Sequence, residues 1–351
     1  MFSPALPGIW EFWKKSLYKR LLPLVEICDI MSKDNHGKKG KAAMKTVFII
    51  NPKAGKGENA EELRAKIRSI ASAQGTDVEI YVTKCPGDGT QFVKQYIAEN
   101  GSARFIACGG DGTLNEVLNG VVGSVGSEIG VLPAGTGNDF CRNFAGDFSD
   151  IEAILAGSAV PCDAISYTTE EDGKQKTGYC ANMFNIGFDC NVADTTAVMK
   201  QKPFISGSLA YLLSIFTVLI KKKGADLAIT LDGEEFHRGK LLLTSIANGC
   251  FCGGGIKSNP LAEVSDGMLN TNIIYNISRL NFLTKLPYYM KGTHIRLPGI
   301  EKIIFTGKYK KIGITPLSGT MRLCIDGEII NAGKTEFEVI PGAFLFVVPK
   351  K

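Results

Sequence analysis

The sequence has 351 residues, which exceeds the usual size of one domain and predicts two. A hydrophobic share of 44% and a charged share of 21% are typical of globular proteins and exclude a disordered or fibrous chain. The net charge of +5 is too small to favour a nucleic-acid-binding protein, and it suits an anionic small molecule or an anionic membrane surface.

Cysteine and histidine usage excludes several classes of site. The ten cysteines form no CxxC pair, and most of them lie inside apolar runs, as buried reduced thiols do. We therefore expect a reducing compartment. The three histidines are far apart in the sequence, so a histidine-based metal site or a Ser-His-Asp triad is not expected.

Residues 1–43 precede the first regular pattern. The stretch "IWEFWKKSLYKRLLPLV" mixes Trp and Leu with Lys and Arg, which is typical of a helix that lies on a membrane. An unstructured extension or a misplaced start codon is the alternative, because Met44 stands directly before the first strand. No apolar run reaches the roughly 18 residues of a membrane span, and the run at 209–220 predicts a buried or interfacial helix.

Strand and helix patterns alternate from Thr46 onward. The runs "TVFII", "VEIYVT", "RFIAC" and "IGVLP" predict strands, and the first three are followed by segments with apolar residues at helical spacing. This alternation predicts a parallel, doubly wound α/β domain over residues 44–160. Ligands bind such sheets beyond the carboxyl ends of the strands.

The pattern after residue 160 is dominated by strands. Asp-Gly pairs at Asp172, Asp232, Asp266 and Asp326 predict hairpin turns. Two helical segments, around 191–200 and 207–222, interrupt the strands. We therefore expect a mainly antiparallel second domain over residues 161–351. Its last strands, "FEVI" and "FLFVV", pair either within this domain or with the sheet of the first domain, and periodicity does not decide between the two.

Three glycine-rich loops, "NPKAGKG", "GGDGT" and "PAGTGND", follow predicted strands. Such a loop at a helix N-terminus offers free backbone N–H groups to an anion. A plain turn explains any one of them, and a helix N-cap explains Asn138 and Asp139. Neither a Walker A motif nor a GxGxxG turn fits. Three such loops, one with an embedded acid, nevertheless predict a nucleotide with metal-bridged phosphates.

The motifs "NPKAG", "GGDGTLNEVLNG", "PAGTGNDF", "NIGFD" and "DGE" occur in this order. In combination they resemble the diacylglycerol kinase catalytic family, particularly its soluble bacterial, YegS-like lipid kinases. The resemblance runs from about Met44 to the C-terminus. It implies an NAD kinase/phosphofructokinase-like nucleotide domain and a β-sandwich-like domain that helps to form the lipid site.

The resemblance also implies functional residues. The implied contacts to ATP are made by Asn51, Pro52, Lys53, Ala54, Gly55, Thr83, Gly110, Asp111, Gly112, Thr113, Leu114, Asn115, Glu116 and Thr136. Asp111 is further implied to work with Mg²⁺ at the phosphates, Asp326 to be the general base and Glu328 to be its neighbour. A second, structural Mg²⁺ is implied at Asp266, in the loop "AEVSDGM".

The expected activity is transfer of the γ-phosphate of ATP to a lipid hydroxyl, with diacylglycerol as the first candidate and phosphatidic acid as its product. Phosphatidylglycerol, a sphingoid base or a related lipid is the alternative acceptor. NAD kinases share "GGDGT" but not "PAGTGND" with a late "DGE". A lipid-binding scaffold without turnover fits the N-terminal stretch and a patch around Tyr288, Tyr289 and Lys291.

The resemblance further implies a cytoplasmic protein in peripheral contact with the inner face of the membrane. Its partner there is the lipid substrate, and no nucleic acid is expected. The oligomeric state stays open, and a homodimer is one option.

Overall fold

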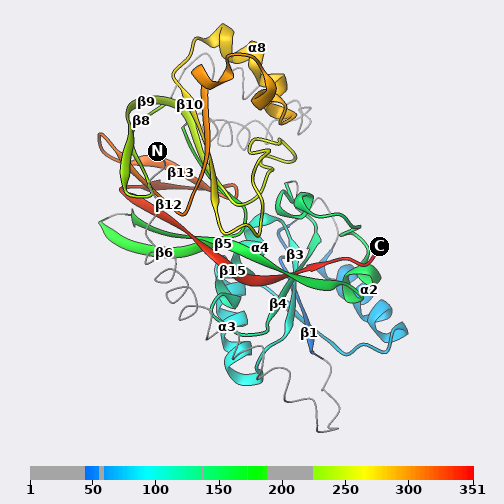
Figure 1. Cartoon of the computed structure of the whole chain (residues 1–351). Helices are drawn as coiled ribbons and strands as arrows, with labels where there is room; N and C mark the ends of the chain where they lie inside the picture. Colours follow the sequence, from blue (N-terminus) through cyan, green and yellow to red (C-terminus); the bar gives the residue numbers. More distant parts are fainter. Residues whose placement is uncertain (1–43, 55–58, 136, 172, 188–223) are drawn as a thin grey trace, which may run out of the picture. The chain divides into compact units, whose positions relative to one another are not determined.

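A computed structural model describes residues 44–54, 59–135, 137–171, 173–187 and 224–351. The predicted helices around 191–200 and 207–222 and the N-terminal stretch 1–43 lie outside the described residues. Residues 44–351 form one unit, in which the α/β part and the strand-rich part share strands (Figure 1).

The first part alternates strands and helices. Its elements are β1 (Thr46–Ile50), α2 (Ala60–Ala73), β2 (Val78–Val82), α3 (Asp88–Asn100), β3 (Arg104–Gly109), α4 (Asp111–Val121), β4 (Glu128–Pro133), the 3₁₀ turn η1 (Phe140–Asn143) and α5 (Ile151–Leu155). The four strands are parallel, in the order β2-β1-β3-β4. Strands β1 and β3 are almost wholly buried, as expected for parallel strands covered on both faces.

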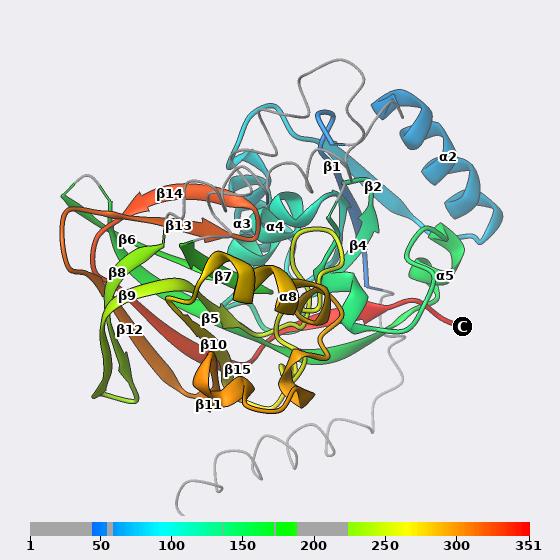
Figure 2. The ribbon, with the colours of Figure 1, turned by 90° about the horizontal axis from the view of Figure 1, so that it is seen from above.

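Helices cover both faces of this sheet (Figure 2). Helices α3 and α4 pack on one face and α2 and α5 on the other, in two separate hydrophobic clusters. Helix α2 illustrates the cause, because Leu63, Ile67 and Ala71 recur every fourth residue and are its buried side chains. The predicted doubly wound α/β arrangement is confirmed.

The second part is mainly antiparallel, as predicted, and forms a sandwich-like layer around its own core. Its elements are β5 (Ser158–Glu171), β6 (Lys174–Cys180), β7 (Met183–Gly187), β8 (Ala225–Leu231), β9 (Glu234–Ala247), β10 (Leu269–Tyr275), α8 (Arg279–Met290), the 3₁₀ turns η2 (His294–Arg296) and η3 (Ile300–Lys302), β11 (Ile304–Tyr309), β12 (Lys311–Pro316), β13 (Met321–Ile325), β14 (Glu328–Ala332) and β15 (Thr335–Val348).

Two of the predicted Asp-Gly turns are two-residue hairpins. Asp232 and Asp326 have φ angles of 47° and 45°, in the left-handed region that such turns require. Asp172 lies outside the described residues. The prediction at Asp266 was wrong: Asp266 lies in the long loop between β9 and β10, because the strand that precedes it ends at Ala247.

The two predicted last strands form one long strand, β15, which pairs with strands of both parts. Its first residues pair antiparallel with β12 and its last pair parallel with β4, at Leu345 and Phe346. A register shift between Ile340 and Phe344 lies between these two stretches, and β5 pairs with β15 on both sides of it. The C-terminal strand therefore belongs to both parts of the fold.

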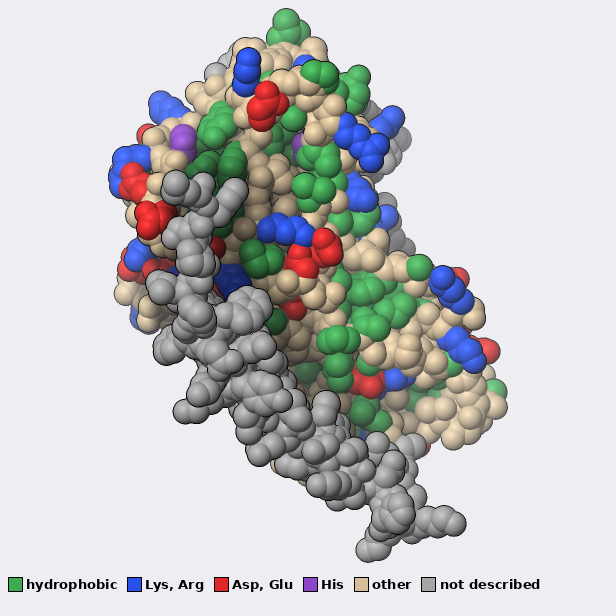
Figure 3. Space-filling model, viewed as in Figure 1, with side chains coloured by type: hydrophobic (Ala, Val, Ile, Leu, Met, Phe, Trp, Pro, Cys, Tyr) green, Lys and Arg blue, Asp and Glu red, His purple; other side chains and the backbone are tan. Residues whose placement is uncertain are grey.

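Phe282 and Tyr289 of helix α8 pack in a small hydrophobic cluster that is separate from the larger cores. Leu280 and Tyr288 are 73% and 45% exposed, whereas Tyr289 is only 6% exposed, so the surface patch expected there does not include Tyr289. Figure 3 shows hydrophobic side chains on the surface around α8, with Lys and Arg side chains beside them. Within the described ranges, no helix is long and apolar enough to cross a membrane.

Candidate functional site

The loop after β1 is fastened to the neighbouring strand and helix. Asn51 donates its backbone N–H to Cys108 O (3.0 Å) and its side-chain amide to Thr113 Oγ1 (3.2 Å), while its own Oδ1 accepts the N–H of Lys53 (3.0 Å). Ala54 closes a turn back onto Asn51 O (3.0 Å).

The structure describes residues 51–54 of this loop, which was predicted to contact ATP. Pro52 and Lys53 are exposed, and Gly55 lies outside the described residues. Thr83, after β2, donates its N–H to Ile50 O at 2.9 Å, so it stands beside the end of β1.

Helix α4 begins at Asp111, and Gly110 is its N-cap residue. Free N–H groups at such an end favour an anion. The predicted contact residues of this helix differ in their surroundings. Leu114 is in the core, and the carboxylate of Glu116 accepts the N–H groups of Gly87 and Gly89, both at 2.9 Å. Asn115 bonds Asn119 within the helix.

Two of the glycine-rich loops touch backbone to backbone. A Cβ on Gly135 would lie 2.5 Å from Gly110 Cα, and one on Gly137 would lie 2.7 Å from Asp111 Oδ2. A side chain at Gly135 would displace the facing backbone, so glycine is required there, whereas one at Gly137 would push the carboxylate of Asp111 aside. Thr136, between these two glycines, lies outside the described residues.

Asp111 faces the second glycine loop. Its Oδ1 accepts the N–H of Asp139 at 2.9 Å, and burial followed by the charge of Asp139 raises the pKa of Asp111 to about 6. The carboxylate is therefore held in a place that disfavours its negative charge.

Asp139 is not the side-chain N-cap that the sequence suggested. Its carboxylate instead accepts the N–H groups of Gly254 (2.9 Å) and Gly255 (2.8 Å), from the loop after β9. Gly253, Gly254 and Gly255 have φ angles of 60°, 85° and 113°, in the left-handed region that favours glycine, and the loop they form brings its N–H groups to Asp139. Burial raises the pKa of Asp139 despite these donors.

The β13–β14 hairpin brings Asp326 to the same region. Its Oδ1 accepts the N–H of Met183 at 2.9 Å, and its Oδ2 lies 3.1 Å from Cys180 Sγ. Burial and then the charge of Asp111 raise the pKa of Asp326 to about 7. The two carboxylates thus lie close enough for each charge to oppose the other.

Glu328 follows Asp326 by two residues and lies beside the start of α4. A Cβ on Gly112 would be 3.2 Å from Glu328 Oε1. Four acidic side chains, those of Asp111, Asp139, Asp326 and Glu328, therefore gather where the glycine loops of the α/β part meet the β13–β14 hairpin.

The donor set suits Mg²⁺ at Asp111. Mg²⁺ in nucleotide sites usually takes one or two protein carboxylates together with phosphate oxygens and water. Arg142 lies 3.5 Å from Asp139 in this region, yet burial still raises the pKa values of Asp111 and Asp326, so a divalent cation at Asp111 would stabilise its ionised carboxylate.

The surroundings of Asp266 do not suit a metal. Its Oδ2 is 2.6 Å from Lys308 Nζ, its Oδ1 accepts the N–H of Met268 (3.0 Å), and Lys308 also reaches Glu263 Oε1 at 2.8 Å. An ammonium group therefore occupies the position between the two carboxylates. Within the described residues, no three His, Cys, Asp or Glu side chains are arranged to hold a metal ion.

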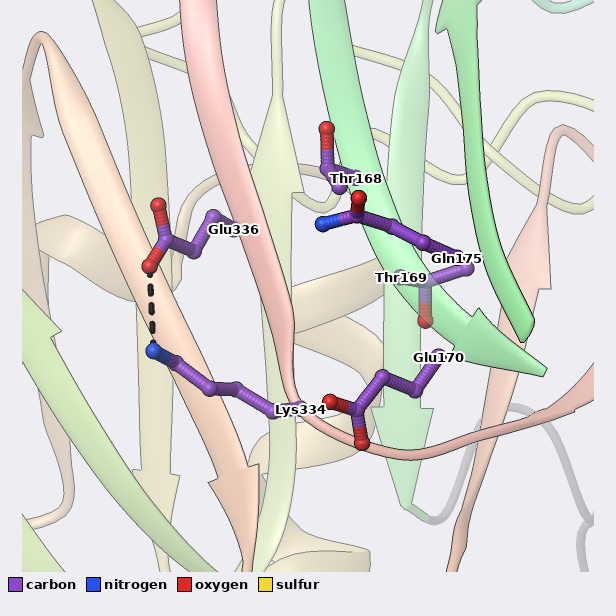
Figure 4. Close-up of a pocket in the computed structure, with 6 residues that line it drawn as sticks. All are labelled: Thr168, Thr169, Glu170, Gln175, Lys334 and Glu336. Atoms are coloured by element: carbon purple, nitrogen blue, oxygen red, sulfur yellow. Dashed lines mark ion pairs between the residues drawn. The ribbon is translucent and has the colours of Figure 1, made fainter. Parts of the chain in front are cut away.

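A hollow of about 340 Å³ lies elsewhere, against the β5–β6 hairpin (Figure 4). Thr169 in its wall is hydrogen-bonded to Thr335 (2.7 Å), and Lys334 forms an ion pair with Glu336 (3.2 Å). None of the predicted site residues lines it. It lies apart from the acidic residues and the glycine-rich loops, so it is not the candidate site.

Two family models match the chain. The "Diacylglycerol kinase catalytic domain" matches residues 45–167, and the "YegS C-terminal NAD kinase beta sandwich-like domain" matches residues 182–348. A "Diacylglycerol kinase" of Staphylococcus aureus is 31% identical over 288 residues, which are 80% of this chain and 85% of that protein. The chain belongs to the diacylglycerol kinase family.

Further similarities agree with this membership. A "Probable lipid kinase YegS-like" of Pseudomonas aeruginosa is 30% identical over 302 residues, covering 84% of this chain and 92% of that protein. The crystal structure of a diacylglycerol kinase from Bacillus anthracis has a TM-score of 0.62 at 22% identity, covering 88% of this chain and 98% of that one, and shows the same fold. A kinase of the diacylglycerol kinase family is therefore the coarse assignment.

Sequence reasoning missed the partners of the acidic residues. Nothing in the sequence connects Cys180 or Met183 with Asp326, because no spacing rule links them. The pair Asp139 and Gly254–Gly255 had a weak signal, since three consecutive glycines indicate a backbone that something approaches closely.

Proposed function

We propose that this protein transfers the γ-phosphoryl group of ATP to the hydroxyl of a lipid, with diacylglycerol as the first candidate acceptor. The observation that carries the proposal is that the hairpin of Asp326 faces the glycine loops around Asp111. A proton acceptor from the strand-rich part thereby stands opposite the anion-binding loops of the α/β part.

The chain's own residues support such a transfer by position and charge. Backbone N–H groups at Gly110–Gly112 would hold the phosphates, and Asp111 would hold the Mg²⁺. When bound, Mg²⁺ supplies positive charge for the phosphate oxygens. Asp326 accepts the proton of the lipid hydroxyl while the hydroxyl oxygen forms a bond to the γ-phosphorus. The bond between the γ-phosphorus and the bridging oxygen of the β-phosphate breaks at the same time, and ADP is released.

The pKa of Asp326 suits this role. A base with a pKa of about 7 is about half ionised at neutral pH and binds a proton more strongly than an ordinary aspartate does. Glu328, beside Gly112, adds negative charge at the edge of the same region.

A lipid acceptor requires the protein to reach a membrane surface. A lipid hydroxyl lies at the surface of a membrane, so we propose peripheral contact with it, supported by the exposed Leu280 and Tyr288 of α8. The Pseudomonas aeruginosa relative is named as a lipid kinase without a stated lipid, and other lipid alcohols are the second group of acceptors to test.

The test is a kinase assay with radiolabelled ATP, Mg²⁺ and a panel of lipids in mixed micelles, with the products identified by mass spectrometry. We expect label on diacylglycerol, and Asp326→Asn to lose at least about 100-fold in kcat because its amide cannot accept the proton.

Asp232→Asn is the matched control, since Asp232 occupies the other left-handed Asp-Gly turn and its Oδ1 acceptor survives in Asn. Absence of label on every lipid, or full activity of Asp326→Asn, would rule the proposal out.

A further inference from the structure

The two oxygens of Asp326 receive donors from one short connection. Strand β6 ends at Cys180 and β7 begins at Met183, and these two residues flank the turn 181–182. The N–H of Met183 donates to Oδ1 at 2.9 Å, and the thiol of Cys180 donates to Oδ2 at 3.1 Å. A single short segment of chain therefore donates a hydrogen bond to each oxygen of the carboxylate.

Cys180 is built to be a donor. Its side chain is completely buried, and burial together with the charge of Asp326 raises the pKa of the thiol well above its usual value. The sulfur therefore keeps its proton, and neither a nucleophilic nor a metal-binding thiolate forms there. Its other acceptor, Met183 O, is farther away, at 3.6 Å.

We propose that Cys180 is a positioning residue of the phosphoryl transfer, which holds Oδ2 of Asp326 so that the carboxylate keeps the orientation that receives the proton of the acceptor hydroxyl. The inference rests on the proposed role of Asp326 as the base.

Loss of the thiol affects Asp326 in two ways. The carboxylate keeps only its backbone donors, Met183 and Asn182, so rotation about its side-chain bonds becomes easier. It also keeps less compensation for the charge of Asp111, which faces it from α4. A hydrogen bond to an ionised acceptor is stronger than one between neutral groups, although a thiol is a weak donor.

The experiment compares Cys180→Ala, which removes the donor, with Cys180→Ser, which keeps a donor. We expect Cys180→Ala to lower kcat about tenfold, while the KM for ATP changes less than about twofold, because the base and not the nucleotide loops is disturbed. Cys180→Ser should recover most of the loss.

Cys162→Ala is the control, because Cys162 is an equally buried thiol on β5, whereas the donors to Asp326 are Met183, Cys180 and Asn182. It should leave kcat unchanged. Equal losses in Cys180→Ala and Cys180→Ser, or a similar loss in Cys162→Ala, would reduce Cys180 to a packing residue and overturn the proposal.

A readout independent of turnover is the infrared S–H stretching band of Cys180, isolated by subtracting the spectrum of Cys180→Ser from that of the wild type. We expect the band at a low, hydrogen-bonded frequency that rises in Asp326→Ala. An unshifted band would also overturn the proposal. A shifted band in a wild-type protein without kinase activity would refute the proposed function while the contact itself stands.

Discussion

The acidic residues of the candidate site are placed where their charge is unfavourable. Asp111, Asp139 and Asp326 each have a pKa raised mainly by burial, and the charge of Arg142 offsets only part of this rise at Asp139. An unfavourable arrangement of this kind is retained at functional sites, where a bound cation relieves it. Two predictions follow at this scale.

Activity should rise with pH through the neutral range. Asp326 accepts a proton only when ionised, and its pKa is about 7, so kcat should fall roughly tenfold for each pH unit below about 6. The measurement is kcat at saturating ATP and lipid from pH 5 to 8.5, with unfolding monitored at each pH. A flat profile, or an inflection near pH 4, would contradict the raised pKa.

Asp111→Asn should stabilise the protein free of ligands while abolishing activity. The folded-state pKa of Asp111, about 6, exceeds its ordinary value of 3.8, so the folded protein binds more protons and loses stability as pH rises through this window. At pH 8 the neutral amide should raise the free energy of unfolding by about 1–3 kcal/mol. Urea unfolding at pH 8 and pH 4 checks this, since the gain should vanish at the lower pH.

Among the elements, the loops provide the hydrogen bonds to the acidic residues and also the glycines that let neighbouring backbones approach each other. The Gly253–Gly255 loop donates to Asp139, and the glycines at 110 and 135 permit the close approach of two of the glycine-rich loops. The loop before β10 is fastened by charge instead, through Lys308.

Lys308→Met should create a dependence on Mg²⁺ that the wild type lacks in this loop. Removing the ammonium leaves Glu263 and Asp266 unpaired, so the variant should lose about 0.5–1 kcal/mol, since the pair is partly exposed. Added Mg²⁺ should restore stability in the variant more than in the wild type. Lys311→Met, which breaks the ion pair with Glu336, is the control. An equal Mg²⁺ effect in wild type and Lys308→Met would refute the expectation.

At the scale of the whole molecule, the two parts of residues 44–351 depend on shared strands. Phe346 of β15 packs against Phe140 and Phe144, with ring centroids 4.9 Å and 4.7 Å apart, inside the core of the α/β part. The last strand in the sequence therefore completes a core most of whose other members come from the first half.

A fragment of residues 44–157 should consequently fail to fold alone. Without β15 it exposes the edge of β4 and the aromatic side chains that Phe346 covers. We expect no cooperative thermal transition by circular dichroism, whereas residues 44–351 should show one. A cooperative transition in the fragment would show that the α/β part is independent of the shared strands.

The sequence by itself determined the local elements and the family. Periodicity of apolar residues predicted β1 to β4 and α2 to α4, because burial of one helix face or of both strand faces leaves a repeating pattern. The Asp-Gly pairs predicted the hairpins at Asp232 and Asp326, because few residue pairs tolerate left-handed backbone. The same rule failed at Asp266, where the pair is a loop fastened by Lys308.

Only the tertiary structure decided which distant groups meet. The pairing of β15 with β4, the donors from Gly254 and Gly255 to Asp139, and the thiol of Cys180 at Asp326 join residues separated by about a hundred positions or more. Such contacts depend on strand order and loop path, which periodicity does not encode. The pKa values of Asp111 and Asp326 share this origin, because burial and a facing charge exist only after the chain has folded.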